Sequence, residues 1–309
     1  MKVAFLFPGQ GSQYVGMGKS LASKFETARS IFHTADEVLG FSLTQLCFDG
    51  PADELQRTEN TQPALLTVSI AACRVLQEQG LRPDCVAGHS LGEYSALVSA
   101  GGLDFADALR LVRKRGRYMQ EAVPQGAGAM AALLKLPEGK LDSILKDAAQ
   151  GEVVSAANLN SPDQIVIAGH AGAVNRAIEL AKAAGARRAI LLPVSAPFHC
   201  VLMKPAQERL AADLDATTFR DLTVPLVNNW QARFVQTAQE AREGLYQQVP
   251  NPVRWAQSIQ QLSSAGVNRF IEVGAGNVLT GLLRNINPEL QGAKFGEAED
   301  WEKVHAATA

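Results

Sequence analysis

The sequence predicts a mixed α/β fold in which a large domain with a mostly parallel sheet carries a smaller inserted domain. Three observations lead to this prediction. Short apolar runs alternate with longer helical patterns along most of the chain, as they do in α/β proteins. A central segment orders its elements differently. The length of 309 residues is near the size at which a single hydrophobic core begins to divide.

The first part of the chain is predicted to alternate buried strands with helices. Residues 3–7 form an apolar run that ends at a glycine-rich turn over residues 9–12, which indicates a buried strand. Pro63 is predicted to open a helix over residues 62–79, because proline suits the first helical turn, and Gly80 ends it. The same reasoning predicts, in order, a strand over residues 85–88, a helix that follows Ser90 and ends at Gly101-Gly102, and a helix over residues 104–120.

Residues 126–195 are predicted to form the smaller domain. Their pattern has the βαββαβ order of ferredoxin-like folds, and about 70 residues suffice for a small domain. Residues 1–125 and 196–309 then form the large domain, to which residues 226–228 and 269–273 add two strands. The elements predicted for the small domain are strands at 129–135, 153–158, 164–169 and 188–193, and helices at 138–149 and 171–184.

Charge and cysteine content exclude several classes of function. The chain has 29 Lys and Arg against 31 Asp and Glu, a formal charge of −2, so it lacks the basic excess of a dedicated nucleic-acid-binding protein. Its four cysteines have no CxxC spacing, which predicts neither a metal site nor a disulfide framework. No apolar stretch approaches the roughly 20 residues that cross a bilayer, and the N-terminal apolar run is too short for a signal peptide. We therefore expect a cytoplasmic protein with no membrane partner.

The strongest chemical signal is Gly88-His89-Ser90-Leu91-Gly92, a G-x-S-x-G pattern between a predicted strand and a predicted helix. This is the nucleophile-elbow context of α/β-hydrolase-like folds, so we expect the large domain to be α/β-hydrolase-like. Small residues on both sides let the backbone turn sharply, which projects the Ser90 hydroxyl above the sheet beside the Leu91 amide. An ordinary structural turn is the alternative.

A serine nucleophile needs a base, and five histidines are available: His33, His89, His170, His199 and His305. His199 lies where the chain leaves the predicted small domain, so it can face a cleft between the domains. From position alone, a base and a packed core histidine are equal alternatives for His199. His89 adjoins Ser90, so its side chain is expected to point away from the serine and to be structural.

Eight short motifs follow one another along nearly the whole chain. They are FPGQGSQ at residues 7–13, TQPA at 61–64, GHSLGEY at 88–94, RGRYMQ at 115–120, NLNSP at 158–162, APFH at 196–199, NPV at 251–253 and EVG at 272–274. In order and spacing this set resembles the bacterial malonyl-CoA:acyl-carrier-protein transacylase family. Four positions depart from the family's pattern, namely Trp230, Pro250, Ala275 and Asn277.

The resemblance implies a catalytic pair and an oxyanion hole. Ser90 would be the acyl-accepting nucleophile and His199 its general base. The backbone amides of Gln10 and Leu91 would hold the oxyanion that forms on the thioester carbonyl. The backbone carbonyl of Gln248 would orient the base, in place of the Asp or Glu found in hydrolase triads.

The resemblance also assigns Arg115 to the free carboxylate of a malonyl group, which a guanidinium can bind through two parallel hydrogen bonds. Gln62, Met119 and Phe198 complete the implied substrate site, and the Phe198 ring would fill the space that the α-methyl group of methylmalonyl needs. From the residues alone, Arg115 belongs to a basic stretch of the kind that is mostly solvated. A surface role is therefore the alternative.

The implied reaction is ping-pong transfer of malonyl from malonyl-CoA to the phosphopantetheine thiol of an acyl carrier protein, which supplies fatty-acid synthesis without a cofactor or a nucleic-acid partner. Both reactants are acidic, so we expect a local basic rim. The candidates for this rim are Lys182, Arg187 and Arg188 on the small domain and Arg113 and Lys114 opposite. The alternatives are an acyltransferase of a polyketide or malonate decarboxylase system, a serine thioesterase or esterase, and a catalytically silent scaffold subunit.

Overall fold

The computed structural model describes residues 2–194 and 196–308, and within them the larger of two sheets has six strands. Their order is β10-β9-β1-β2-β7-β8. All neighbours from β10 to β7 are parallel, and β8 is antiparallel to β7, so the predicted mostly parallel sheet is confirmed. The strands are β1 (Lys2–Phe7), β2 (Cys85–Gly88), β7 (Leu226–Val227), β8 (Phe234–Val235), β9 (Val267–Val273) and β10 (Gln291–Phe295).

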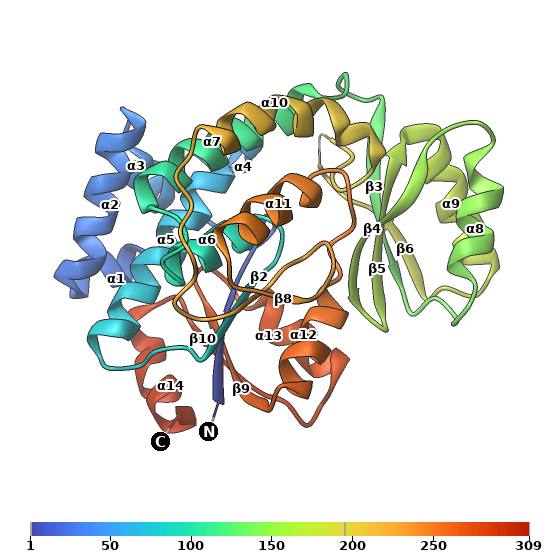
Figure 1. The fold of residues 1–309 in the computed structure, drawn as a ribbon. Coiled ribbons are helices and arrows are strands. Elements are labelled where there is room, and N and C mark those ends of the chain that lie inside the picture. The colour runs from blue at the N-terminus through green and yellow to red at the C-terminus, as the bar shows by residue number, and fades with distance from the viewer. Residues whose placement is uncertain (1, 195, 309) are drawn as a thin grey trace.

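Helices cover both faces of this sheet (Figure 1). Phe5 and Phe7 of β1 pack into one core with α5, α6 and α7, whereas Ala4 and Leu6 pack into a second core with α12 and α13. Successive strand residues point to opposite faces, so an apolar run over the whole strand indicates burial on both sides. The helices of this part are α1 (Lys19–Lys24), α2 (Glu26–Leu39), α3 (Leu43–Asp49), α4 (Ala52–Gln56), α5 (Thr58–Glu78), α6 (Gly92–Ser99), α7 (Phe105–Glu121), α10 (Lys204–Asp215), α11 (Ala238–Gln248), α12 (Trp255–Ser264), α13 (Val278–Ile286) and α14 (Trp301–Thr308).

The start of α5 differs from the prediction, because the helix begins at Thr58 and encloses Pro63 instead of opening there. Proline lacks an N–H and removes one intrahelical hydrogen bond. The first turn is nevertheless held by tertiary contacts: Thr61 Oγ1 donates to the Leu55 carbonyl at 2.6 Å. Gly116 of α7 lies so close that a Cβ there would be 2.6 Å from the Thr58 carbonyl oxygen. Packing therefore lets the helix begin at Thr58, ahead of Pro63, where proline alone would have started it.

The second sheet comprises β3 (Gly128–Leu134), β4 (Val154–Ser161), β5 (Gln164–His170) and β6 (Arg188–Leu191), all antiparallel in the order β4-β5-β3-β6. Figure 1 shows α8 (Leu141–Ala149) and α9 (Ala171–Ala183) on its outer face. These elements enclose a core of their own. The predicted βαββαβ order is present, with the first helix beginning at Leu141 instead of residue 138.

Backbone pairing attaches β4 of the small sheet to the segment that follows α11. The Leu159 amide donates to the Val253 carbonyl, and the Val253 amide donates to the Ala157 carbonyl, each at 2.9 Å. Val253 follows α11, the helix that ends at Gln248. The edge of the small sheet is therefore attached to the same segment that carries Gln248.

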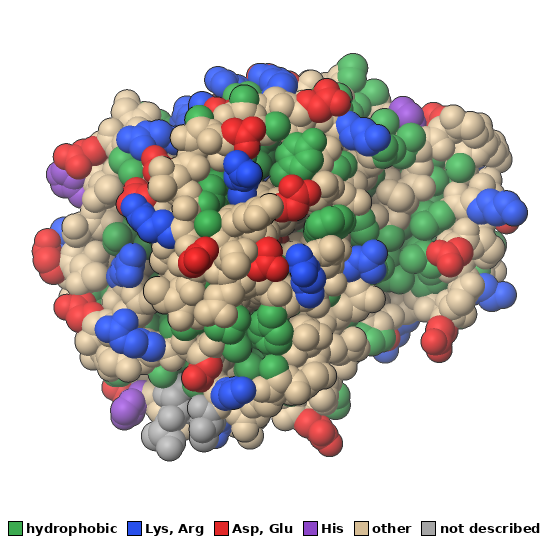
Figure 2. Space-filling view, in the orientation of Figure 1, with side chains coloured by type: hydrophobic (Ala, Val, Ile, Leu, Met, Phe, Trp, Pro, Cys, Tyr) green, Lys and Arg blue, Asp and Glu red, His purple; other side chains and the backbone are tan. Residues whose placement is uncertain are grey.

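Charges of both signs are interspersed on the face of the molecule shown in Figure 2. The four cysteines are buried and free. Among the described residues no group of three or more His, Cys, Asp or Glu side chains is placed to hold a metal ion. No helix in the described ranges has the length and apolarity needed to span a membrane.

Candidate active site

Ser90 occupies the sharp turn between β2 and α6. Its φ is +51°, a left-handed conformation that costs a non-glycine residue roughly 1–2 kcal/mol. The turn is packed against the end of β1, because a Cβ on Gly92 would lie only 2.0 Å from the Phe7 carbonyl oxygen. Glycine at position 92 is therefore required for the elbow to approach the first strand this closely.

The Ser90 hydroxyl contacts a histidine from the distant segment after the small sheet. Ser90 Oγ lies 2.7 Å from His199 Nε2. His199 Nδ1 lies 3.0 Å from the Gln248 backbone carbonyl oxygen, which can only accept, so the Nδ1 proton is donated there and Nε2 is left as the acceptor. His199 is 3% exposed. The pair has the geometry of a serine and its base.

Burial and the nearby Arg115 charge lower the pKa of the His199 imidazole to about 3. Burial disfavours the charged form of the ring, and a neighbouring cation disfavours it further. The imidazole is therefore neutral at pH 7 and able to take a proton from Ser90.

Arg115 of α7 is buried directly beside this pair, with 1% of its surface exposed. Its Nη1 donates to Gln62 Oε1 at 2.9 Å. Its Nη2 donates to Gln248 Oε1 at 2.7 Å and to Ser90 Oγ at 3.1 Å. Among the described residues Nε has no hydrogen-bond partner, and no carboxylate forms a salt bridge with the guanidinium. The predicted alternative of a solvated surface arginine is wrong for Arg115.

The glycine-rich turn after β1 lies against the elbow. A Cβ on Gly9 would lie 2.3 Å from the His89 carbonyl oxygen, so the next residue, Gln10, is carried up to the serine. Within the described ranges neither the Gln10 nor the Leu91 backbone N–H donates to a protein acceptor. Two unpaired amides beside a nucleophile are the arrangement of an oxyanion hole.

These groups line a cavity of about 320 Å³ between the two sheets, a volume that suits a small-molecule site. Eight of the nine residues predicted for the site line it: Gln10, Gln62, Ser90, Leu91, Arg115, Met119, Phe198 and His199. The ninth, Gln248, is fully buried and reaches the cavity only through its bonds to His199 and Arg115. Met130, Asn158 and residues 192–194 close the wall on the small-sheet side.

Residues 4–294 match the model of the acyl transferase domain family. The chain belongs to this family. It is 50% identical over 295 residues to the malonyl CoA-acyl carrier protein transacylase of Escherichia coli strain K12, which covers 95% of this chain and 96% of the relative.

Two solved structures of the acyl transferase family have closely similar folds. The acyl carrier protein S-malonyltransferase from Vibrio cholerae superimposes with a TM-score of 0.96 at 47% identity, covering 98% of this chain and all of that one. A malonyl-transacylase in complex with a type II PKS acyl-carrier protein has a TM-score of 0.96 at 46% identity, covering all of this chain and 99% of that one.

Two buried polar residues of this acyl transferase were not predicted as site residues. Glu93 of α6 is 1% exposed, and its Oε2 accepts from the Asn229 amide at 3.0 Å and from Gln248 Nε2 at 2.8 Å. Burial raises the pKa of the Glu93 carboxyl to about 7. Glu93 stands within the GHSLGEY motif, and Asn229 precedes Trp230, but an acidic residue in a first helical turn ordinarily predicts only a favourable helix dipole contact.

His89 is directed away from the serine. Its Nε2 lies 2.8 Å from Asn160 Oδ1 of β4, and its ring packs on Trp255 at a centroid distance of 5.4 Å. Burial lowers the pKa of the His89 imidazole. These contacts link the elbow to the small sheet and are those of a structural histidine.

The depressed pKa of His199 has a direct spectroscopic consequence. We expect its imidazole to stay neutral from pH 8 down to pH 5 in the ligand-free protein, because burial and the Arg115 charge both oppose protonation. The measurement is NMR of histidine-labelled protein, with the His199 signals assigned by their loss in His199→Gln. A titration centred near the ordinary value of about 6.5 would contradict this expectation.

Proposed function

We propose that this acyltransferase moves the malonyl group of malonyl-CoA to the phosphopantetheine thiol of an acyl carrier protein, through a malonyl-serine intermediate, and so supplies extender units for fatty-acid synthesis. One observation carries the proposal: Arg115, a buried arginine that forms no salt bridge with any carboxylate in the part of the chain that the structure describes, lies 3.1 Å from the candidate nucleophile. A dicarboxylic acyl group brings the missing carboxylate with it. The names of the relatives point to the same donor and acceptor.

In the first half-reaction Ser90 Oγ attacks the thioester carbonyl carbon while its proton passes to His199 Nε2, 2.7 Å away. The carbonyl oxygen becomes an oxyanion and receives hydrogen bonds from the Gln10 and Leu91 amides. The carbon–sulfur bond then breaks, and CoA leaves as a thiol after His199 returns the proton to sulfur. The product is a malonyl ester of Ser90.

The second half-reaction runs the same steps in reverse with a different thiol. His199 takes the proton of the phosphopantetheine thiol, and the sulfur attacks the acyl-serine carbonyl carbon. The same two amides hold the oxyanion. Cleavage of the ester bond returns the proton from His199 to Ser90 Oγ, and the malonyl thioester of the carrier protein leaves.

Arg115 provides selectivity for the donor. Its guanidinium is held on two sides by amide oxygens of Gln62 and Gln248, which orient it without neutralising it. A malonyl carboxylate would restore charge balance, whereas an acetyl group would leave the buried cation unpaired. Met119 and Phe198, 2% and 8% exposed, narrow the cavity around the acyl chain and leave little room for an α-methyl substituent.

The hydrogen-bond partner of His199 favours acyl transfer over hydrolysis. Gln248 presents a neutral carbonyl to His199 Nδ1, and a neutral acceptor stabilises the imidazolium less than the buried Asp of a hydrolase triad. Activation of water is correspondingly weaker. The acyl-serine then survives until a thiol, which is the better nucleophile, arrives.

The domain boundaries and the location follow from the same interpretation. We assign residues 1–125 and 196–309 to an α/β-hydrolase-like catalytic domain, and residues 126–195 to a ferredoxin-like small domain, although Met1, Ser195 and Ala309 lie outside the described residues. Separate cores support this division. The substrates of the proposed reaction are compatible with the cytoplasmic location expected from the sequence.

A carrier-docking rim is best supported at Arg187 and Arg188. Both are exposed and line a surface hollow of about 560 Å³ between the small sheet and α13. Lys182 and Lys114 are already paired with Glu179 and Asp213, which makes them weaker candidates. Arg113 stacks on Phe41, 4.3 Å from the ring centroid.

The main alternative is that the same malonyl transfer serves a different pathway, with a different acyl carrier protein as acceptor. One structural neighbour serves a type II PKS carrier, and this favours a polyketide acyltransferase as the second candidate. The site chemistry is shared between the two, so a carrier-protein or ketosynthase gene beside this one would discriminate them.

Ser90→Ala is expected to abolish the malonyl adduct, because it removes the atom that accepts the acyl group. Intact-mass spectrometry after incubation with malonyl-CoA measures the adduct. Ser95→Ala, which changes a buried serine of α6, the helix that follows Ser90, is the matched control and should keep it. Rapid release of free malonate by the wild type would indicate a thioesterase, and neither adduct nor turnover would indicate a scaffold.

Arg115→Ala is expected to lower the preference for malonyl-CoA over acetyl-CoA, measured as the ratio of kcat/KM values, by at least about 100-fold, because two charge-assisted hydrogen bonds of about 1.5–3 kcal/mol each are lost. Arg117→Ala, an exposed arginine of the same helix, is the control and should leave the ratio unchanged. An unchanged ratio in Arg115→Ala would remove this residue from the substrate site.

Arg187→Glu combined with Arg188→Glu is expected to raise the KM for the carrier protein several-fold and leave the KM for malonyl-CoA unchanged, because only the carrier would meet the reversed charges. Lys140→Glu combined with Lys146→Glu makes the same change in net charge elsewhere on the small domain and is the control. Equal carrier KM values in the two double variants would place the docking rim elsewhere.

A further inference from the structure

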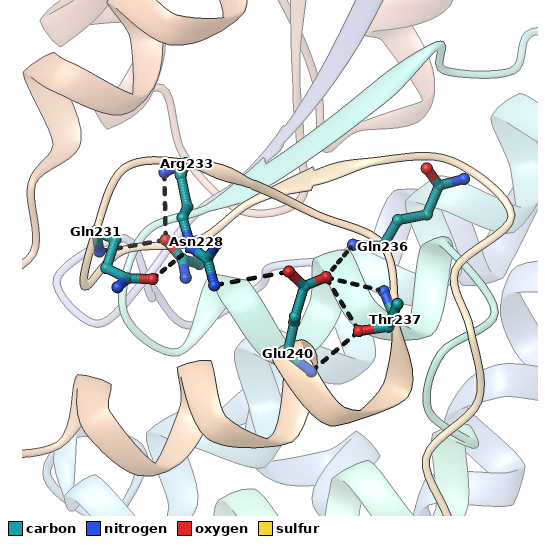
Figure 3. A network of polar contacts seen from close by, with 6 residues as sticks. All are labelled: Asn228, Gln231, Arg233, Gln236, Thr237 and Glu240. Atoms are coloured by element: carbon teal, nitrogen blue, oxygen red, sulfur yellow. Dashed lines mark hydrogen bonds and ion pairs between the residues drawn. The ribbon is translucent and has the colours of Figure 1, made fainter.

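Two adjacent asparagines, Asn228 and Asn229, occupy the turn between β7 and β8 and are both buried, with 1% and 0% of their surfaces exposed. Figure 3 shows that Asn228 serves the turn itself: its Oδ1 accepts from the Gln231 and Arg233 amides at 3.2 and 3.3 Å. The Asn228 amide donates to the Arg233 carbonyl at 3.1 Å. The turn is therefore held by its own hydrogen bonds, and Asn229 is free to serve another element.

The side chain of Asn229 forms two hydrogen bonds to the backbone of the nucleophile elbow, one on each side of His89. Its Oδ1 accepts from the Ser90 amide at 2.7 Å. Its Nδ2 donates to the Gly88 carbonyl at 2.7 Å. One planar amide thus bridges His89, from the carbonyl of Gly88 at the end of β2 to the amide of Ser90 in the turn, and pairs two backbone groups at the point where the strand ends and the helix has not yet begun.

Asn229 is in turn fixed by contacts to its own backbone. Its amide donates to Glu93 Oε2 at 3.0 Å, and its carbonyl accepts from the Arg254 amide at 3.0 Å. Glu93 belongs to α6, the helix that follows the elbow, and Arg254 precedes α12. Two elements therefore hold the backbone of this residue, so its side chain has little freedom to turn away from Ser90.

The bond to the Ser90 amide has two effects on the reaction geometry. It holds Ser90 at a φ of +51°, a conformation that persists only where the surroundings enforce it. It also occupies the Ser90 N–H, so the amides left for a substrate oxygen on this wall belong to Gln10 and Leu91. The first effect fixes the position of Ser90 Oγ relative to His199, and the second limits which amides can receive the substrate oxygen.

We propose that Asn229 is a positioning residue for the nucleophile, which holds the strained backbone of Ser90 so that its hydroxyl meets His199 and the substrate carbonyl. It acts through Ser90 and touches no reacting atom. This inference rests on the proposed function only for the identity of the substrate. The positioning of Ser90 does not depend on that identity, so it can be measured with a serine reagent that carries no malonyl group.

The experiment compares wild type and Asn229→Ala in single-turnover acylation at saturating reagent, because a first-order rate constant reports the folded sites alone. Malonyl-CoA is the first reagent. The second is a neutral fluorophosphonate, from which Ser90 Oγ displaces fluoride at phosphorus while its proton passes to His199. We expect both rate constants to fall about 100-fold, the penalty of a misplaced reacting atom. The malonyl-to-acetyl preference and the KM for malonyl-CoA should stay unchanged, because Asn229 is not a hydrogen-bond partner of Arg115, whose bonds to the side-chain oxygens of Gln62 and Gln248 remain.

Asn228→Ala is the matched control, since it removes a buried asparagine from the same turn without touching the elbow. It should lower the melting temperature as much as Asn229→Ala and leave both rate constants unchanged. If Asn229→Ala does not fold, Asn229→Asp fills the same space and keeps an oxygen before the Ser90 amide but loses the donor to Gly88. Its rate constants should then lie below those of the wild type.

The outcomes separate this proposal from the proposed function. Wild-type rate constants in Asn229→Ala or Asn229→Asp, or an equal fall in Asn228→Ala, would overturn the positioning role. Labelling of Ser90 by the fluorophosphonate without acylation by malonyl-CoA would overturn the proposed substrate, and the rate constants of labelling would still decide the role of Asn229. Failure of both reagents on the wild type would overturn both.

Discussion

The arrangement of the site depends on one constraint, a guanidinium buried at Arg115 that forms no salt bridge with a carboxylate among the described residues. A buried charge is tolerated only when its hydrogen-bonding capacity is largely used. Here neutral oxygen atoms of Gln62, Gln248 and Ser90 accept its hydrogen bonds at 2.7–3.1 Å. Each of these oxygens must be held in turn, which explains why buried polar residues extend beneath the elbow to Glu93 and Asn229. A cavity lined only by apolar groups could not keep this charge in place.

Gln248 connects the His199 side of the site with the Arg115 side, because its backbone and its side chain bind different partners. The backbone carbonyl accepts from His199 Nδ1 at 3.0 Å, and the side-chain oxygen accepts from Arg115 at 2.7 Å. The side-chain nitrogen donates to the Ser90 carbonyl at 2.9 Å and to Glu93. His199, Ser90 and Arg115 are therefore all hydrogen-bonded to one residue at the end of α11. The segment after it pairs with β4, so the small sheet is attached to the same anchor.

Sequence reasoning found what depends on local chemistry. A serine between a buried strand and a helix, and the order of elements in the small sheet, were predicted because glycines and apolar periodicity act over a few residues. Pro63 misled the prediction of α5, since the helix start is set by contacts with α7 that no local pattern records. Position left two roles open for His199, and only the resemblance favoured the base; the fold brings it across 109 residues to Ser90. Asn229 was missed because its partners, Gly88 at the end of β2 and Ser90 in the turn after it, are about 140 residues away in the sequence.

The Arg115 charge also links binding of the substrate carboxylate to the pKa of His199. Burial is the larger cause of the low His199 pKa and the Arg115 charge is the second. In the proposed mechanism a malonyl carboxylate neutralises that charge, so the pKa of His199 rises when the correct donor is seated and the imidazole becomes a stronger base. An acetyl donor leaves the guanidinium charge in place, and the base stays weak. The selectivity for malonyl over acetyl then arises in the proton transfer from Ser90 as well as in binding. An interaction that assists the chemical step raises kcat in addition to lowering KM.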